Sequence, residues 1–146
     1  MKYEIVNLDQ KTVVGISGFT SNEDPRMQAV IGGLWERLYQ GGVSAGIKNK
    51  VNEYAIGLYS DYSKDGYCVT VGNEVSGAEN EDLAVKTIPA GKYAKFSVRG
   101  HMQKAVAEAW GEIWKLDLAR SFAADFEEYR SADPENAEID IYVSLR

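Results

Sequence analysis

The sequence predicts an α+β fold built from two similar βαββ halves, and three observations support this prediction. A strand rich in β-branched residues, an amphipathic helix and two further strands follow one another twice along the 146 residues. The two halves, about 1–78 and 79–146, have matching lengths, and we expect one domain with a pseudo-twofold axis. The predicted architecture is an antiparallel sheet with two main helices and a ligand cleft between the halves.

The elements of the first half follow from hydrophobic periodicity and turn residues. They are strands at 1–8 and 12–19, a helix at 25–40, a loop at 43–53, strands at 54–60 and 67–75, and a turn between these two strands. We expect the first two strands to form a hairpin. Asp24 is the expected cap of the helix, and Pro25 suits its first turn. Gly32 and Gly33 inside the helix would be explained by a close approach to the sheet.

The second half repeats this order after the small, charged connector SGAENED. Its elements are strands at 83–89 and 92–100, a helix at 102–117, and strands at 125–131 and 138–146. In the last strand, Ile139, Ile141 and Val143 point one way while Asp140 and Tyr142 point the other.

Composition and single residues exclude several classes of site. A net charge of −6 disfavours direct nucleic-acid binding and makes a cationic ligand more plausible than an anionic one. Cys68 and His101 are the only residues of their kinds, so we expect no disulfide, no metal site and no cofactor. Cys68 is expected to be a buried, inert thiol, and His101 structural or exposed. No segment resembles a membrane span or signal peptide, so the expected location is the cytoplasm.

The strands at 54–60 and 125–131 carry the candidate site. Placing one half on the other matches Tyr59 with Tyr129 and Gly57 with Glu127, and side-chain alternation puts each matched set on one face of its strand. If those faces meet, they form an aromatic site with one carboxylate and one missing side chain, suited to a lipophilic or aromatic cation. The alternative is a solvated glutamate beside tyrosines that pack on the sheet.

The tryptophans allow two interpretations. Trp35, Trp110 and Trp114 lie on the apolar stripes of the helices, which is typical of core residues. Trp35 or Trp110 would alternatively reach the cleft between helix and sheet.

Seven segments carry a resemblance to a known family: VVGISGF, LWERLY, AIGLYSDY, IPAGKYAKFSVRG, AWGEIWKLDLARS, DFEEY and EIDIYVSLR. With them the chain resembles the GyrI-like effector-binding domains, also called the bacterial transcription activator effector-binding family. Ser144 stands where the family often has proline. The resemblance implies duplicated SHS2-type βαββ units with the ligand between them. It also implies that Glu127 takes the place of a buried glutamate that meets lipophilic cations in multidrug-responsive regulators, within a cage of Tyr59, Tyr129 and Trp110 beside Gly57.

Family regulators join this domain to a helix-turn-helix DNA-binding domain, and the sequence is expected to be a stand-alone member. The first hypothesis is therefore a sensor or sequestering protein for lipophilic, cationic or aromatic small molecules. The second, also suggested by relatives, is a hydrolase of strained cyclopropane-type electrophiles, with Glu127 as general base and Tyr129 or Tyr59 polarising the leaving centre. The third is a protein partner of the DNA gyrase kind, for which the sequence shows no exposed patch.

Overall fold

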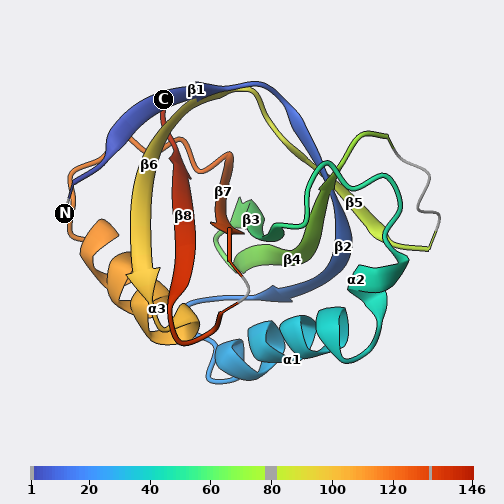
Figure 1. Ribbon diagram of the computed structural model, residues 1–146. Helices are drawn as coiled ribbons and strands as arrows, with labels where there is room; N and C mark the ends of the chain where they lie inside the picture. The colour runs from blue at the N-terminus through green and yellow to red at the C-terminus, as the bar shows by residue number, and fades with distance from the viewer. Residues whose placement is uncertain (1, 78–81, 132) are drawn as a thin grey trace.

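The computed structural model describes residues 2–77, 82–131 and 133–146 and shows one antiparallel sheet of eight strands with three helices (Figure 1). The elements are β1 (Glu4–Leu8), β2 (Lys11–Thr20), α1 (Met27–Tyr39), α2 (Val43–Gly46), β3 (Ala55–Ser63), β4 (Gly66–Val75), β5 (Ala84–Ile88), β6 (Gly91–Gly100), α3 (Met102–Ile113), β7 (Ala124–Tyr129) and β8 (Ala137–Ser144). The strand order is β1-β6-β8-β7-β3-β4-β2-β5. The α+β class and the antiparallel sheet are confirmed. None of the described helices combines the length and apolar character that crossing a membrane requires.

The strand registers show how the two halves repeat. Ile56 pairs with Gly72 between β3 and β4, and Phe126 pairs with Tyr142 between β7 and β8, each residue lying 70 positions after its counterpart. The predicted boundary between the halves, at residues 78 and 79, lies outside the described residues.

The axis that relates the halves passes through the centre of the sheet. Strands β3 and β7 are neighbours there, and Gly57 pairs directly with Glu127. These two residues are also equivalent under the shift of 70 positions. When two equivalent residues pair with each other, the twofold axis passes between them, so one glycine and one glutamate flank the axis.

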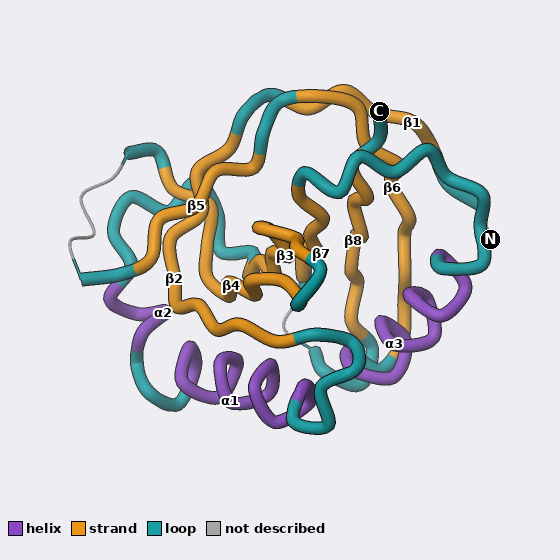
Figure 2. The backbone as a smooth tube through the Cα atoms, turned by 180° about the vertical axis from the view of Figure 1, so that it is seen from behind, coloured by secondary structure: helices purple, strands orange, loops and turns teal. Residues whose placement is uncertain are grey.

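The first strand of each half pairs with the other half. Strand β1 pairs with β6 and β5 pairs with β2, as Figures 1 and 2 show from opposite sides. The predicted hairpin between 1–8 and 12–19 is therefore wrong. Pairing with β6 lets Val6 and Leu8 pack against the third core cluster, which removes part of their apolar surface from water.

Three clusters of buried side chains form the core. Helix α1 covers β2 and β4, where Leu34 and Leu38 pack on Val14, Val69 and Val71. Helix α3 covers β6 and β8 through Val106, Ala109 and Ile113 on the same side of the sheet. The sheet curves strongly, and its other face encloses the third cluster. Its members are Val13, Ile56, Leu58, Ile88, Tyr93, Ala124, Phe126 and Tyr142.

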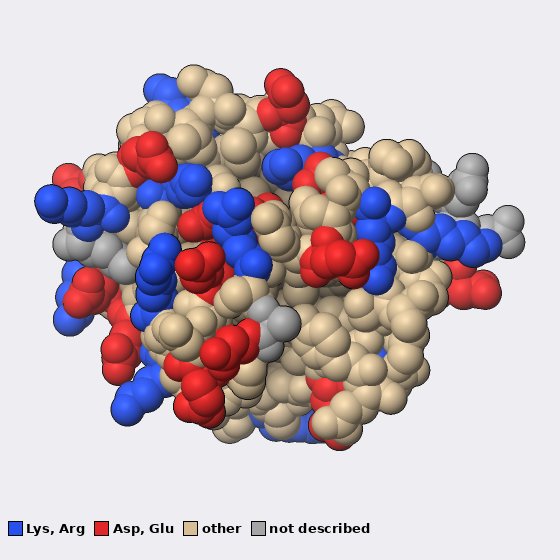
Figure 3. All heavy atoms as spheres, viewed as in Figure 1, with Lys and Arg blue, Asp and Glu red and all other residues tan. Residues whose placement is uncertain are grey.

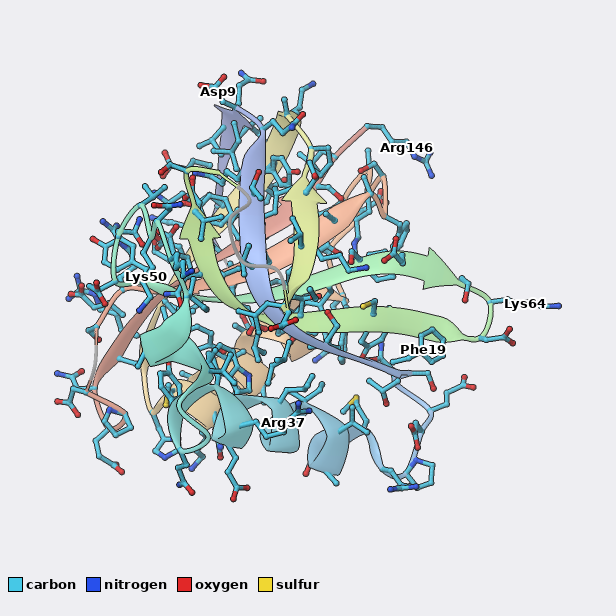
Figure 4. The ribbon with its side chains drawn as sticks, turned by 90° about the vertical axis from the view of Figure 1, so that its right-hand side faces the viewer. Asp9, Phe19, Arg37, Lys50, Lys64 and Arg146 are labelled. Carbon is cyan, nitrogen blue, oxygen red and sulfur yellow. The ribbon has the colours of Figure 1, made fainter. Side chains whose placement is uncertain are left out.

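Several local predictions differ from the structure. The predicted loop at 43–53 contains the short helix α2, and the predicted turn at 61–66 shrinks because β3 runs on to Ser63. Figure 4 shows the resulting β3–β4 hairpin extending outward, with Lys64 at its tip. Gly32 and Gly33 do not lie close to the sheet, since a Cβ at either position would meet open space.

The two main helices also begin differently from each other. Helix α1 starts at Met27, and the carboxylate of Asp24 does not cap it but accepts hydrogen bonds from the Arg26 backbone and the Thr20 hydroxyl. Helix α3 is capped by His101, whose Nδ1 accepts from the backbone N–H groups of Gln103 and Lys104, both at 3.3 Å. The single histidine therefore has a structural role.

Candidate functional site

Glu127 lies in the middle of β7, and its side chain points to the side of the sheet that carries α1 and α3. Only 2% of Glu127 is exposed, whereas its neighbour Phe126 points to the third core cluster on the opposite face. The predicted alternation is confirmed, since Tyr59 and Tyr129 also lie on the helix side and both reach Glu127. The alternative of a solvated glutamate is wrong.

Three aromatic side chains donate hydrogen bonds to the carboxylate. The Tyr129 hydroxyl donates to Oε1 at 2.7 Å. The Tyr59 hydroxyl and the Trp110 indole N–H donate to Oε2 at 2.9 and 2.7 Å. These donors come from β3, β7 and α3, so the sheet and the second-half helix together hold the acid in place.

Burial and hydrogen bonding act on the carboxylate in opposite directions. Loss of water raises the pKa of Glu127 above its ordinary value, and the bonds from Tyr129, Trp110 and Tyr59 oppose this rise without cancelling it. Burial, followed by the nearby carboxylate, raises the pKa of Tyr59 and of Tyr129 well above the ordinary phenol value. Both tyrosines therefore stay protonated and remain donors at neutral pH.

Trp35 completes the surroundings of the acid from α1. Its Cζ2 atom lies 3.1 Å from the point where a Cβ on Gly57 would stand, and Glu127 Oε1 lies at the same distance from that point. The predicted gap beside Gly57 is thus occupied, and a Cβ there would press on both neighbours. We call Trp35, Tyr59, Trp110 and Tyr129 the aromatic cage.

The cage rings touch edge to face and continue outward to exposed rings. Trp35 meets Tyr129 at a centroid distance of 5.0 Å, and Tyr59 meets Trp110 at 5.8 Å. Tyr39 extends the cage from Trp35 and Trp114 extends it from Trp110. The prediction of a core position is wrong for Trp114, which is 57% exposed. Trp35 and Trp110 are half-buried and pack against the core clusters under their helices, and both also reach the cage.

A second buried acid, which the sequence interpretation missed, lies two residues before Glu127 on the same strand face. Asp125 is fully buried and forms an ion pair with Arg120 at 2.6 Å. Tyr62 and the backbone and hydroxyl of Ser144 also donate to it. The alternation that singled out Glu127 and Tyr129 also places Asp125 on this face, but nothing in the pattern pointed to Arg120, which lies outside the helices and strands.

Two hollows on the described part of the chain lie away from the cage, so the predicted cleft between the halves stays a prediction. One, of about 130 Å³, lies over β6 and β8 and is lined in part by Lys95, Arg99, Arg130 and Asp140. The other lies along α1 beside Arg37. Figure 3 shows basic and acidic side chains interspersed on one face of the molecule, without a large area of one sign.

The remaining candidate residue from the sequence, Cys68, lies in the middle of β4. It is half-buried, not buried as expected, and its thiol forms no disulfide. Its sulfur lies 3.9 Å from the Thr70 hydroxyl, on the face of β4 opposite to Tyr67 and Val69, which belong to the cluster under α1. It is therefore separate from the aromatic cage. Within the described residues, no group of three or more His, Cys, Asp and Glu side chains is arranged to hold a metal ion.

Comparison with solved structures shows the same fold in three other proteins. SAV2435, in a structure bound to tetraphenylphosphonium, has a TM-score of 0.86 at 23% identity, over 100% of this chain and 94% of that one. An integron cassette protein from the mobile metagenome of Vibrio cholerae has a TM-score of 0.79 at 28% identity, over 99% and 95%. A putative bacterial transcription regulation protein from Staphylococcus aureus has a TM-score of 0.75 at 28% identity, over 99% of both chains.

No curated protein sequence matches the chain. One family model does, and its match runs over residues 4–145 and so includes every strand and helix of the fold. The resemblance to GyrI-like effector-binding domains is confirmed by this match and by the neighbouring structures. The chain belongs to the Cass2 family of integron-associated effector binding proteins.

Proposed function

We propose that this protein binds lipophilic cations that carry aromatic groups, at the aromatic cage around Glu127, and acts as a sensor or sequestering protein for them. The observation that carries the proposal is a buried carboxylate that three neutral donors hold in place. No ion pair among the described residues joins Glu127 to a lysine or arginine. Buried charges are ordinarily paired, so this one is suited to a cation from outside.

Asp125 provides an internal comparison. It is as deeply buried as Glu127 and also contacts a tyrosine hydroxyl, but its own cation, Arg120, lies 2.6 Å away. The Arg120 guanidinium in turn lies over the Phe122 ring, with 4.3 Å between its central carbon and the ring centroid. The chain thus neutralises one acid with an internal cation among rings and leaves the other acid, in similar surroundings, without one.

The hydrogen bonds of Glu127 favour binding over general-base catalysis. Three hydrogen bonds already occupy most of the roughly four lone-pair sites of the carboxylate. Oε1 accepts one from Tyr129, and Oε2 accepts two, from Tyr59 and Trp110. A general base needs a free lone pair directed at the proton that it removes. A cation, in contrast, interacts with the carboxylate through its charge and with the rings through their faces, without displacing these donors.

The comparisons agree with this proposal at the level of the family. The family model describes effector binding, and SAV2435 shares the fold in a structure that holds a lipophilic cation. The identity of 23% to SAV2435 supports a common fold, so the assignment of the cage depends on the contacts of this chain.

The test compares two neighbouring acids on opposite faces of one strand. We expect tetraphenylphosphonium to quench the tryptophan fluorescence of the wild-type protein, because Trp35 and Trp110 line the cage. Glu127→Gln keeps the shape and loses the charge, and it should lower the affinity about tenfold or more. Glu128→Gln is the matched control, since Glu128 points to the other face and its variant should stay within about twofold of wild type.

A neutral probe separates charge from shape. Triphenylphosphine oxide has aryl groups and no net charge, so Glu127→Gln should change its weaker binding little. If the wild-type protein fails to bind tetraphenylphosphonium, or if Glu127→Gln and Glu128→Gln bind it equally well, the proposal is wrong.

A further inference from the structure

The aromatic cage repeats about the same axis as the fold. Helices α1 and α3 begin at Met27 and Met102, and Trp110 follows Trp35 by the same 75 positions. Tyr129 follows Tyr59 by the 70 positions that relate the strands. The contact between Trp35 and Tyr129, at 5.0 Å and 74°, is therefore the symmetry mate of the contact between Trp110 and Tyr59, at 5.8 Å and 79°.

The outer aromatic rings of the two helices are related by the same shift of 75 positions. Tyr39 stacks on Trp35 with centroids 6.1 Å apart, and Trp114, again 75 positions later, lies 6.3 Å from Trp110. Tyr39 is 53% exposed and Trp114 is 57% exposed. Two aromatic arms thus extend from the axis to solvent. The first arm consists of Tyr39, Trp35 and Tyr129, and the second consists of Trp114, Trp110 and Tyr59.

The single charge lies where the two arms meet. Glu127 flanks the axis opposite Gly57, and each arm donates a tyrosine hydroxyl to a different carboxylate oxygen, Tyr129 to Oε1 and Tyr59 to Oε2. The indole N–H of Trp110 and the contact of Tyr59 with Tyr67, at 5.7 Å, have no counterpart in the first arm. The carboxylate therefore lies between two aromatic arms and not at the end of one.

We infer that the site prefers cations whose positive centre lies between two aromatic groups over cations whose charge lies at one end of an aromatic group. This inference rests on the proposed function, because it specifies the ligand of the same cage. A centred cation can place its charge near Glu127 and one aromatic group on each arm. A cation with a terminal charge places all its rings on one arm and leaves the other without a ligand contact.

Two isomeric quaternary ammonium ions test this preference. Dibenzyldimethylammonium carries its charge between two phenyl rings. The isomer (biphenyl-4-ylmethyl)trimethylammonium has the same atoms, charge and number of rings, but its charge lies at one end. By titration calorimetry on the wild-type protein, we expect the first ion to bind about tenfold more tightly than the second, since it gains a second aromatic contact and close charge placement.

Variants of the exposed outer rings show whether both arms take part. Tyr39→Leu and Trp114→Leu alter half-exposed positions, so the protein should fold in both cases. Each variant should weaken the centred cation by a similar factor, about twofold to fivefold. The terminal cation should be weakened by one of the two variants only, because it occupies one arm.

The outcomes separate this inference from the proposed function. Equal affinities for the two isomers would overturn the preference and leave cation binding at Glu127 standing. The preference would also be overturned, and cation binding at Glu127 retained, by either of two other results. One is that tetraphenylphosphonium binds and neither isomer does. The other is that only one of the two outer-ring variants weakens the centred cation. If none of the three cations binds, both the preference and the proposed function are overturned.

Discussion

Glu127, which we propose to bind the ligand, also lowers the stability of the folded protein. A buried carboxylate that no cation neutralises loses its hydration without a full replacement, and its raised pKa is the sign of that loss. Three hydrogen bonds reduce the penalty but do not remove it. The residue that we propose to bind the ligand therefore destabilises the ligand-free protein.

This cost predicts how stability depends on pH. Because the pKa of Glu127 is raised from 4.5 in the folded state, the folded protein holds this proton more tightly than the unfolded chain does. The contribution of Glu127 is thus greatest below pH 4.5 and is lost as the pH rises through the raised pKa.

Glu127→Gln should lack this loss, so its free energy of unfolding should increase relative to that of wild type as the pH rises above 4.5. Urea unfolding at several pH values measures the difference. A difference that stays constant or shrinks as the pH rises would contradict the burial of the charged form.

Part of the site follows from the sequence alone. Side-chain alternation along two strands predicted that Gly57, Tyr59, Glu127 and Tyr129 lie on one face of the sheet. The face to which a side chain points depends only on the two-residue period of a strand. Which helix side chains reach the acid depends on how each helix rotates and packs on the sheet. Trp35 was therefore left between two interpretations, and the partner of Asp125 was not found at all.

At the scale of elements, the periodic patterns located both main helices and all eight strands to within a few residues. The partners of the first strands were not predictable in this way. Only Asp9 and Gln10 separate β1 from β2, which is typical of a hairpin. The true partner, β6, lies more than 80 positions away and is chosen by the core that Val6 and Leu8 join.

Strand β5, which belongs to the second half and pairs with β2 of the first half, should contribute to stability mainly through one buried side chain. Ile88 is fully buried in the third core cluster, whereas Val85 on the same strand is 45% exposed. Ile88→Ala should therefore lower the free energy of unfolding by about 2–4 kcal/mol. The control Val85→Ala should change it by less than about 0.5 kcal/mol. Equal losses for the two variants in urea titrations would contradict the dominant contribution of the Ile88 side chain.

At the scale of the whole molecule, each half depends on the other because the first strand of each half pairs with a strand of the other half. The edge of β2 is covered by β5 from the second half, and the edge of β6 is covered by β1 from the first. The third core cluster draws side chains from both halves. A half on its own would lose a strand partner and part of its core, so we expect the two halves to unfold together.

Tryptophans in different halves can report this cooperativity. A Trp110→Phe/Trp114→Phe variant keeps Trp35 in the first half, and Trp35→Phe keeps the two tryptophans of the second. In each variant, the urea midpoint by fluorescence should coincide with the midpoint by far-UV circular dichroism. Separate midpoints within one variant would show that a half unfolds alone.

The position of Glu127 beside the axis also limits how many molecules one chain can accept. A duplicated fold would ordinarily offer two equivalent places, one for each copy. Here both copies converge on a single point, and the counterpart of the acid is Gly57. We therefore expect one ligand per chain and a simple hyperbolic saturation curve, even though the architecture is double.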